Sequence, residues 1–183
     1  MLFRSQIRNN TISGHRDGIY FEFVTESLIE GNTCTKNIRY GLHFMFSNND
    51  NYEHNQFINN GAGVAVMYSH QVVMRFNLFR ENWGESAYGL LLKEITDGEI
   101  THNQFMGNSV GLYMEGTNRM DVAQNRFSSN GWAIKIQANC DGNNITTHNF
   151  EMNTFDLGTN GSLVLNTFSG NYWDKYNGFD WDR

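Results

Sequence analysis

Three observations predict that the chain is all-β and folds as a right-handed, single-stranded parallel β-helix with about 22 residues per coil. The phrase Asn-x-apolar-x-x-Asn recurs along the chain, a Gly- or Ala-led stretch of alternating residues follows most copies, and the 183 residues include no proline. Units of this length are too short to fold alone, so each must bury its apolar side against its neighbours. Proline is disfavoured where nearly every strand is central and needs its N–H.

The Asn phrase marks the start of each repeat. Its first asparagines lie 55−32=23, 77−55=22, 103−77=26 and 125−103=22 residues apart. In a stack of coils these amides would form ladders that bond to one another and to the turn backbone. The copies that we assign are Asn10–His15 (a looser one), Asn32–Asn37, Asn55–Asn60, Asn77–Asn82, Asn103–Asn108, Asn125–Asn130 and Asn166–Asn171.

The third place of each phrase is apolar and predicts an internal ladder of mostly aromatic rings. Ring pairs of this kind add about 1 kcal/mol each beyond burial. The residues that we expect in this ladder are Ile12, Cys34, Phe57, Phe79, Phe105, Phe127, Phe155 and Phe168.

The stretches that follow, such as GIYFEF from Gly18 and GLHFMF from Gly41, predict strands with one face in the core. A third short strand is expected before the next Asn phrase, as in SLIEGN and VVMRFN. The residues predicted to point inward are Ile19, Phe21, Phe23, Leu42, Phe44, Phe46, Val64, Val66, Leu90, Leu92, Leu112, Met114, Ile134 and Ile136.

Composition and the chain ends set further bounds. We expect a β-helix over residues 1–170, a fragment of a longer solenoid because its first coil has no amphipathic cap, and a Tyr/Trp/Asp-rich tail over 171–183. The net charge of −6 without a Lys/Arg cluster argues against a nucleic-acid partner. Cys34 and Cys140 are too far apart along the stack to bridge, so free thiols are expected. No apolar run is long enough for a signal peptide or a membrane-spanning helix.

The outward side of the Gly-led strands contains the strongest chemical signal. Met45 and Met67 are 67−45=22 residues apart and therefore neighbours on successive coils, about 4.8 Å apart, while His43 lies two residues before Met45 on the same face. His70, at the following turn, could join from the side. Thioethers and an imidazole are soft ligands that suit Cu(I). The alternative is that both methionines cover a patch where another protein packs.

An insertion lengthens one coil and predicts a partner-binding loop. The stretch ENWGESAYG places Trp83, Glu85 and Tyr88 on a protruding turn next to Leu91 and Lys93. Aromatic residues on protruding loops suit recognition. The alternative is a loop that folds its aromatic side chains back onto the solenoid.

A polysaccharide-binding protein, or a lyase or epimerase that acts on polyuronides, is the rival hypothesis. Such an enzyme needs carboxylates for a cation or for the substrate charge, and a base such as Lys, Arg or His. The outward face offers Glu22, Lys93, Glu115 and Lys135, but no clustered aspartates and no paired arginines. We therefore expect a protein that is not an enzyme.

The stretches GLHFMF, GVAVMYS and YGLLLKE, and the closing SGNYWDKYNGFDWDR, resemble the NosD family over nearly the whole chain. His43, Met45, Met67, Tyr88 to Glu94 and Asn171 to Tyr176 together make the resemblance more specific than the Asn repeat alone. It implies a periplasmic, noncatalytic accessory protein that helps to assemble the copper centre of nitrous oxide reductase. The implied partners are that reductase, an ABC transporter and a copper chaperone. Copper would then be transient cargo.

Overall fold

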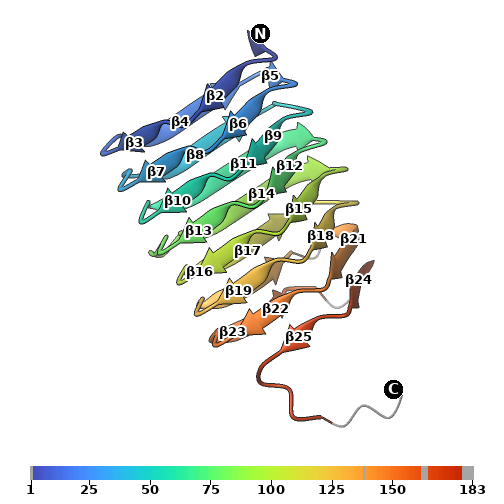
Figure 1. Cartoon of the computed structure of the whole chain (residues 1–183). Helices are drawn as coiled ribbons and strands as arrows, with labels where there is room; N and C mark the ends of the chain where they lie inside the picture. Colours follow the sequence, from blue (N-terminus) through green and yellow to red (C-terminus); the bar gives the residue numbers. More distant parts are fainter. Residues whose placement is uncertain (1, 138, 162–164, 179–183) are drawn as a thin grey trace.

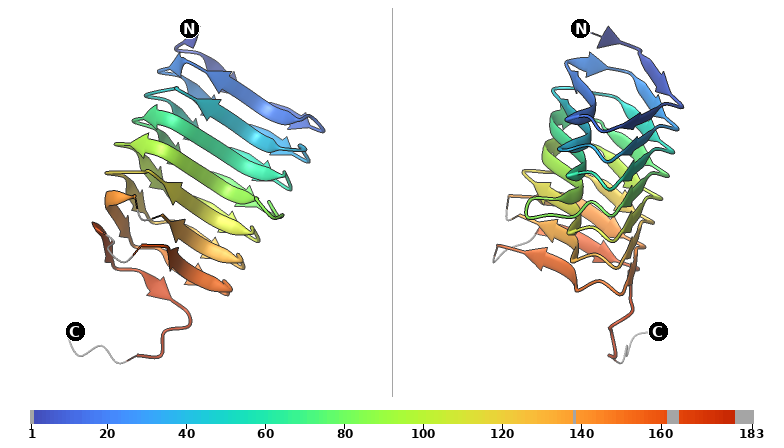
Figure 2. Two further views of the ribbon diagram at one scale, coloured as in Figure 1. Left: turned by 180° about the vertical axis from the view of Figure 1, so that it is seen from behind. Right: turned by 90° about the vertical axis from the view of Figure 1, so that its left-hand side faces the viewer.

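The computed structural model describes residues 2–137, 139–161 and 165–178, and within this part of the chain all regular secondary structure is β. The strands are parallel and wind into a solenoid of about 7 turns that repeat about every 23 residues (Figure 1). The predicted parallel β-helix is confirmed. Views from behind and from the side show the coils stacked one on the next, with the termini at opposite ends (Figure 2).

Each coil contributes one strand to each of three sheets, which we call sheets I, II and III in chain order. Sheet I contains β2 (Gln6–Arg8), β6 (Leu28–Glu30), β9 (Asn51–Glu53), β12 (Val73–Arg75), β15 (Glu99–Thr101), β18 (Asp121–Ala123), β21 (Asp141–Thr146) and β24 (Leu165–Ser169). Sheet II contains β3 (Thr11–Ser13), β7 (Thr33–Thr35), β10 (Gln56–Ile58), β13 (Leu78–Arg80), β16 (Gln104–Met106), β19 (Arg126–Ser128), β22 (Asn149–Glu151) and β25 (Tyr172–Trp173). Sheet III contains the Gly-led strands β4 (Asp17–Glu22), β8 (Tyr40–Met45), β11 (Ala62–His70), β14 (Tyr88–Thr96), β17 (Val110–Glu115) and β20 (Trp132–Ile136), followed by β23 (Phe155–Thr159). A separate pair joins β1 (Leu2–Phe3) to β5 (Val24–Thr25).

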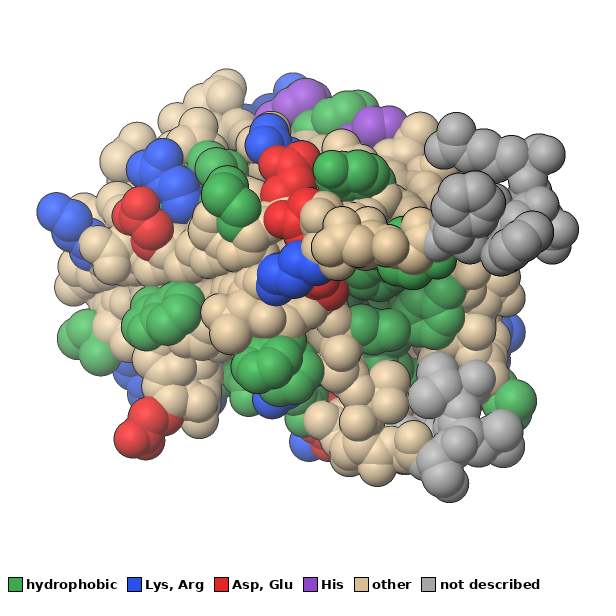
Figure 3. Space-filling view, turned by 90° about the horizontal axis from the view of Figure 1, so that it is seen from below, with side chains coloured by type: hydrophobic (Ala, Val, Ile, Leu, Met, Phe, Trp, Pro, Cys, Tyr) green, Lys and Arg blue, Asp and Glu red, His purple; other side chains and the backbone are tan. Residues whose placement is uncertain are grey.

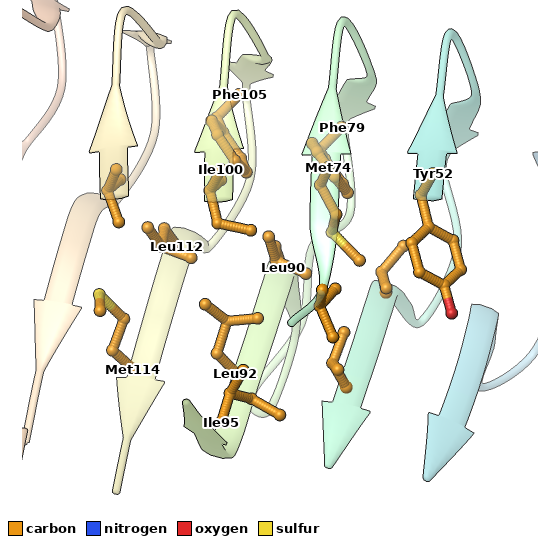
Figure 4. Close-up of a cluster of buried hydrophobic side chains, with 14 of the residues drawn as sticks. Tyr52, Met74, Phe79, Leu90, Leu92, Ile95, Ile100, Phe105, Leu112 and Met114 are labelled. Carbon is orange, nitrogen blue, oxygen red and sulfur yellow. The ribbon is translucent and has the colours of Figure 1, made fainter. Parts of the chain in front are cut away.

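The core lies between the three sheets and consists of inward ladders. Phe57, Phe79 and Phe105 are paired in register in sheet II, with ring centroids 5.5 and 4.7 Å apart. Leucines and methionines of sheet III belong to the same buried cluster, and the interior view shows Leu90 and Met114 on the strands across from Phe79 and Phe105 (Figure 4). Cys34 and Cys140 are free and buried, as predicted.

Buried asparagines at the corners hold adjacent coils together. Asn55 accepts hydrogen bonds at Oδ1 from the backbone nitrogen and the Nδ2 of Asn32, at 3.0 Å each, and donates from its own Nδ2 to the Ile29 carbonyl. Asn77 repeats the pattern toward Asn55. The ladder therefore satisfies polar groups that would be costly to bury unpaired.

Glycine is the second residue of most strands of sheet III because the coils approach closely at this position. A Cβ atom on Gly63 would lie 2.3 Å from the carbonyl oxygen of Gly89 in the next coil. Contacts this short exclude a side chain without a shift of the backbone.

The predicted inward positions are buried except for Phe23 and Phe46, where the prediction was wrong. Both rings are exposed at a corner of the solenoid, where Phe23 stacks on Phe46 and Phe46 stacks on Tyr68. These three residues have φ values of 55, 49 and 53°, in the left-handed region that non-glycine residues uncommonly adopt. The chain turns there, so the next residue, such as Val24, points inward instead.

The prediction was also wrong for the last coils. Phe150 and Trp173 continue the aromatic ladder after Phe127, whereas Phe155 pairs with Trp132 in sheet III and Phe168 pairs with Ile145 in sheet I. His148 occupies the Asn position of this coil and accepts a hydrogen bond from the Asn125 backbone at Nδ1, 3.0 Å away. The Asn-x-apolar-x-x-Asn pattern did not identify this coil, because its phrase begins with histidine. The domain boundary after residue 170 stays a prediction, and residues 179–183 of the predicted tail lie outside the described part of the chain.

Ion pairs on the outer surface connect neighbouring coils. Arg119 contacts Asp97 at 2.7 Å, and Arg126 contacts Glu151 at 2.6 Å. Acidic and basic side chains lie side by side on the surface seen from below (Figure 3). Such exposed pairs are screened and contribute little each.

Candidate functional site

The outward face of sheet III has two ladders, and both have the predicted register. Tyr20, His43 and Ala65 are paired across β4, β8 and β11, and Met45 and Met67 are paired beside them. Tyr20 is exposed, as expected for the outward face, but the expectation of exposure was wrong for the next three positions of the first ladder. His43 retains only 5% of its accessible surface, and Ala65 and Leu91 are buried as well.

His43 is buried because two tyrosines cover it. The Tyr20 ring contacts it edge-on at a centroid distance of 5.3 Å, and the Tyr40 ring lies 4.7 Å away. Both ring nitrogens of His43 are buried and have no hydrogen-bond partner. Burial lowers the pKa of His43, and nearby Arg39 lowers it further, so the ring is neutral and able to act as an acceptor or ligand at neutral pH.

Beside His43 lies a hollow of about 460 Å³ in which several chemical groups converge. One carboxylate oxygen of Asp17, Oδ1, is also buried there without a partner. The lining residues are Arg16, Asp17, Tyr20, Arg39, His43, Met45 and Met67. The two arginines were missed in the sequence, because they precede the strands on the corner and not on the alternating face.

Met45 and Met67 are half-buried, and the next coils continue their ladder with charges. Met67 pairs with Lys93, whose Nζ lies 2.9 Å from a carboxylate oxygen of Glu115. A hydrogen bond to Glu115 raises the pKa of Lys93. The methionine pair is therefore bounded on one side by a partly exposed ion pair.

His70 does not join the other predicted ligands at the hollow. It lies three residues after Met67 in β11, beyond Tyr68, where the backbone turns the corner. Its side chain is exposed, and its backbone nitrogen donates to Asn48 Oδ1 at 2.9 Å.

The residues predicted to bind a partner divide into two groups. Trp83 and Glu85 lie on the inserted loop, exposed, and line a groove of about 330 Å³ with Ile38 and Arg39. Trp83 and Ile38 expose 64% and 79% of their surface. Tyr88 instead begins β14 and packs against Tyr113, and Leu91 and Lys93 follow it on the sheet. Arg39 lines both the groove and the hollow.

A donor set of histidine, cysteine, aspartate and glutamate alone does not form here: no three such side chains cluster as metal ligands within 2–137, 139–161 and 165–178. The hollow instead offers one unpaired imidazole and two thioethers. This set fits a soft monovalent metal such as Cu(I) better than a hard cation.

The fold defines the class of protein, a parallel β-helix, here with a hollow on the outward face of one sheet. The chain belongs to the NosD family, whose model, described as periplasmic copper-binding protein, matches residues 2–178. No curated protein matches the chain by sequence. In the described part of the chain, no helix is long and apolar enough to cross a membrane.

Solved structures with the same fold include two alginate-modifying enzymes. The A-module of mannuronan C-5 epimerase AlgE6 from Azotobacter vinelandii superposes with a TM-score of 0.75 at 15% identity, covering 93% of this chain and 55% of that one. An alginate lyase from Paenibacillus sp. str. FPU-7 gives 0.69 at 13% identity, with 88% and 65% covered. The chain thus spans less than two thirds of either, and identities this low establish the shared fold alone.

Proposed function

We propose that the protein is a noncatalytic, periplasmic accessory protein for assembly of the copper centre of nitrous oxide reductase. It serves as a docking scaffold and as a transient carrier of Cu(I), which is cargo. The main support is the arrangement of an unpaired, neutral imidazole beside two half-buried thioethers in a family described as copper-binding.

His43, Met45 and Met67 would hold the ion. Three soft donors satisfy Cu(I), and an open face allows the ion to leave again. His70 is left out of this donor set because its exposed side chain lies beyond the corner.

Docking would use the loop beside the hollow. Trp83 and Ile38 supply exposed apolar surface, and Arg39 and Glu85 supply charge next to it. Tryptophan and arginine are enriched among residues that dominate binding energy. The partners that we propose are nitrous oxide reductase, the copper chaperone and the ABC transporter of the same maturation system.

An anaerobic titration with Cu(I) against a coloured chelator tests the carrier role. The wild type should compete for one equivalent, and a variant with His43, Met45 and Met67 all replaced by alanine should not. Circular dichroism checks that the variant remains folded. Retained affinity in the folded triple variant would exclude this site.

A second candidate function is binding or modification of an acidic polysaccharide. Its support is that Arg16 and Arg39 line the same hollow as Asp17, Tyr20 and His43, and guanidinium groups match carboxylates. A titration with an oligouronate, followed by NMR, distinguishes the two functions. Chemical-shift changes that the oligouronate causes in the wild type but not in Arg39→Ala would favour polysaccharide binding. An unchanged wild-type spectrum, together with competition for Cu(I), would favour the carrier.

A further inference from the structure

The unpaired imidazole of His43 lies under a side chain that is positioned as a lid. The Tyr20 ring covers His43 from the preceding coil, yet Tyr20 itself retains 51% of its accessible surface. A ring that buries its neighbour while facing solvent can rotate outward without disturbing the core. The hollow beside it provides open space.

One hydrogen bond fixes the tip of this ring. The Tyr20 hydroxyl donates to Glu22 Oε1 at 2.6 Å, between residues two apart on the same outward face of β4. Glu22 is the register partner of Met45. The anchor of the ring therefore lies in the same ladder as the two thioethers.

Tyr40 forms the other wall and is held differently. Its ring packs against His43 and under the guanidinium of Arg39, which lies 4.6 Å from the ring centroid. It is less exposed than Tyr20. Tyr20 is thus the more exposed of the two rings, and its hydrogen bond to Glu22 is the contact that an outward rotation would break.

We propose that Tyr20 is a gate over His43, latched by Glu22, and that His43 becomes accessible only when the Tyr20 ring swings outward. This inference deepens the proposed function, since it concerns access to the same site and identifies how an ion carrier would limit exchange. In the latched state Met45 and Met67 line the hollow, while both ring nitrogens of His43 are buried. An arriving ion would meet the thioethers first.

Accessibility of the imidazole can be measured without any metal. Diethyl pyrocarbonate modifies exposed histidines, and mass spectrometry reports the rate at each position. In the wild type His43 should react much more slowly than exposed His70. Buried His148 serves as an internal monitor of unfolding.

Breaking the latch should raise the rate at His43 alone. Tyr20→Phe removes the hydroxyl and keeps the ring, and loss of a hydrogen bond of this kind predicts an increase of about fivefold. Glu22→Ala should give a similar increase, and the double variant no further gain, because both changes break one contact. Tyr20→Ala should raise the His43 rate further than Tyr20→Phe does, because it removes the ring and leaves Tyr40 as the remaining cover.

The matched control is Tyr113→Phe. Tyr113 lies in the same ladder as Tyr20, and its hydroxyl accepts from Gln137 Nε2 at 2.7 Å, away from the hollow. This variant should leave the His43 rate unchanged. The gate is excluded if wild-type His43 reacts as fast as His70, or if Tyr20→Phe and Tyr20→Ala leave its rate unaltered while His148 stays protected.

A Cu(I) uptake experiment distinguishes failure of the gate from failure of the proposed carrier function. In stopped-flow transfer from a coloured chelate, Tyr20→Phe should accelerate uptake by the same factor. If the wild type takes up no Cu(I) but His43 is still uncovered by Tyr20→Phe, the gate stands and the carrier role fails. Cu(I) uptake with equal rates in both proteins would instead overturn the gate.

Discussion

Met45 of β8 and Met67 of β11 are direct register partners, so backbone hydrogen bonding fixes the spacing of the two positions that carry the thioethers. The double variant Met45→Leu/Met67→Leu conserves volume and should cost less than about 1.5 kcal/mol in unfolding free energy. Cu(I) affinity should fall by at least about tenfold, or about 1.4 kcal/mol. Chelator competition measures it. Met152→Leu, an exposed methionine away from the hollow, is the control and should bind as the wild type does.

Asp50 is a fully buried carboxylate whose Oδ1 accepts a hydrogen bond from the Ser27 backbone at 2.7 Å. Burial raises its pKa from 3.8 to about 6, so the folded state holds the proton that the unfolded state releases. Stability should therefore fall as pH rises from about 4 to 6, by up to roughly 3 kcal/mol.

Asp50→Asn tests this pH dependence. Asn143, the equivalent residue of a later coil, already accepts from a backbone nitrogen and donates to a carbonyl. The variant should be more stable than the wild type at pH 7, and the gain should vanish near pH 4. Urea unfolding at both pH values measures it, and a gain that is independent of pH would contradict the assignment.

Because of His148, we expect a contribution to stability with the opposite pH dependence. Burial lowers its pKa from 6.5 to about 4, so the unfolded state binds the extra proton between these values. The contribution of neutral His148 to the free energy of unfolding is complete above pH 6.5. This contribution, roughly 3 kcal/mol, should be lost as pH falls toward 4. His148→Asn restores the residue found at Asn125 and Asn171 and should flatten the acid limb of the stability curve, as measured by thermal unfolding at several pH values.

The aromatic ladder should dominate the stability of the central coils. Phe105 is fully buried between Phe79 and Phe127, at 4.7 Å from each. Phe105→Ala should cost about 3–5 kcal/mol. Phe76→Ala, at an exposed corner, should cost roughly 0.5 kcal/mol. Chemical denaturation of both variants checks the contrast, and equal losses would contradict it.

Trp83 should matter for association and not for folding. Its exposed ring lines the groove beside Arg39, so Trp83→Ala should leave the melting temperature nearly unchanged. Binding to copper-free nitrous oxide reductase, measured by surface plasmon resonance, should weaken by at least about 2 kcal/mol if Trp83 is an anchor residue. Glu81→Ala, at an exposed corner outside this groove, is the control.

The coil architecture could be predicted because its determinants are local in sequence. Gly63 and the alternation after it specify a strand, and Asn55 and Asn60 specify the corners around it. The aromatic register failed at Phe155, where His148 replaced the asparagine that marks the coil, and at Phe168, where Asn166 continues the ladder of Asn143 at a different corner. The corner at Phe46 could not be predicted, because nothing in a phenylalanine indicates a left-handed backbone.

The site could be predicted only in part. The pairing of Met45 with Met67 follows from the repeat length. The burial of His43 does not follow from the repeat length. It depends on Tyr20 of the preceding coil and on Tyr40 at the start of the same strand. Arg39 could not be predicted as a lining residue of the hollow, because it lies at a corner and outside the alternating pattern of the strands.

The inserted loop leaves the backbone ladder intact on both sides. The chain between Glu81 and Ala87 forms no strand, yet β11 and β14 remain in register from Val64–Leu90 to His70–Thr96. The loop can therefore be lengthened, shortened or exchanged with that of another coil without changing the register of Met45 with Met67. An insertion at this corner thus alters the surface beside the sheet and leaves the strand pairing of the two methionines as it is.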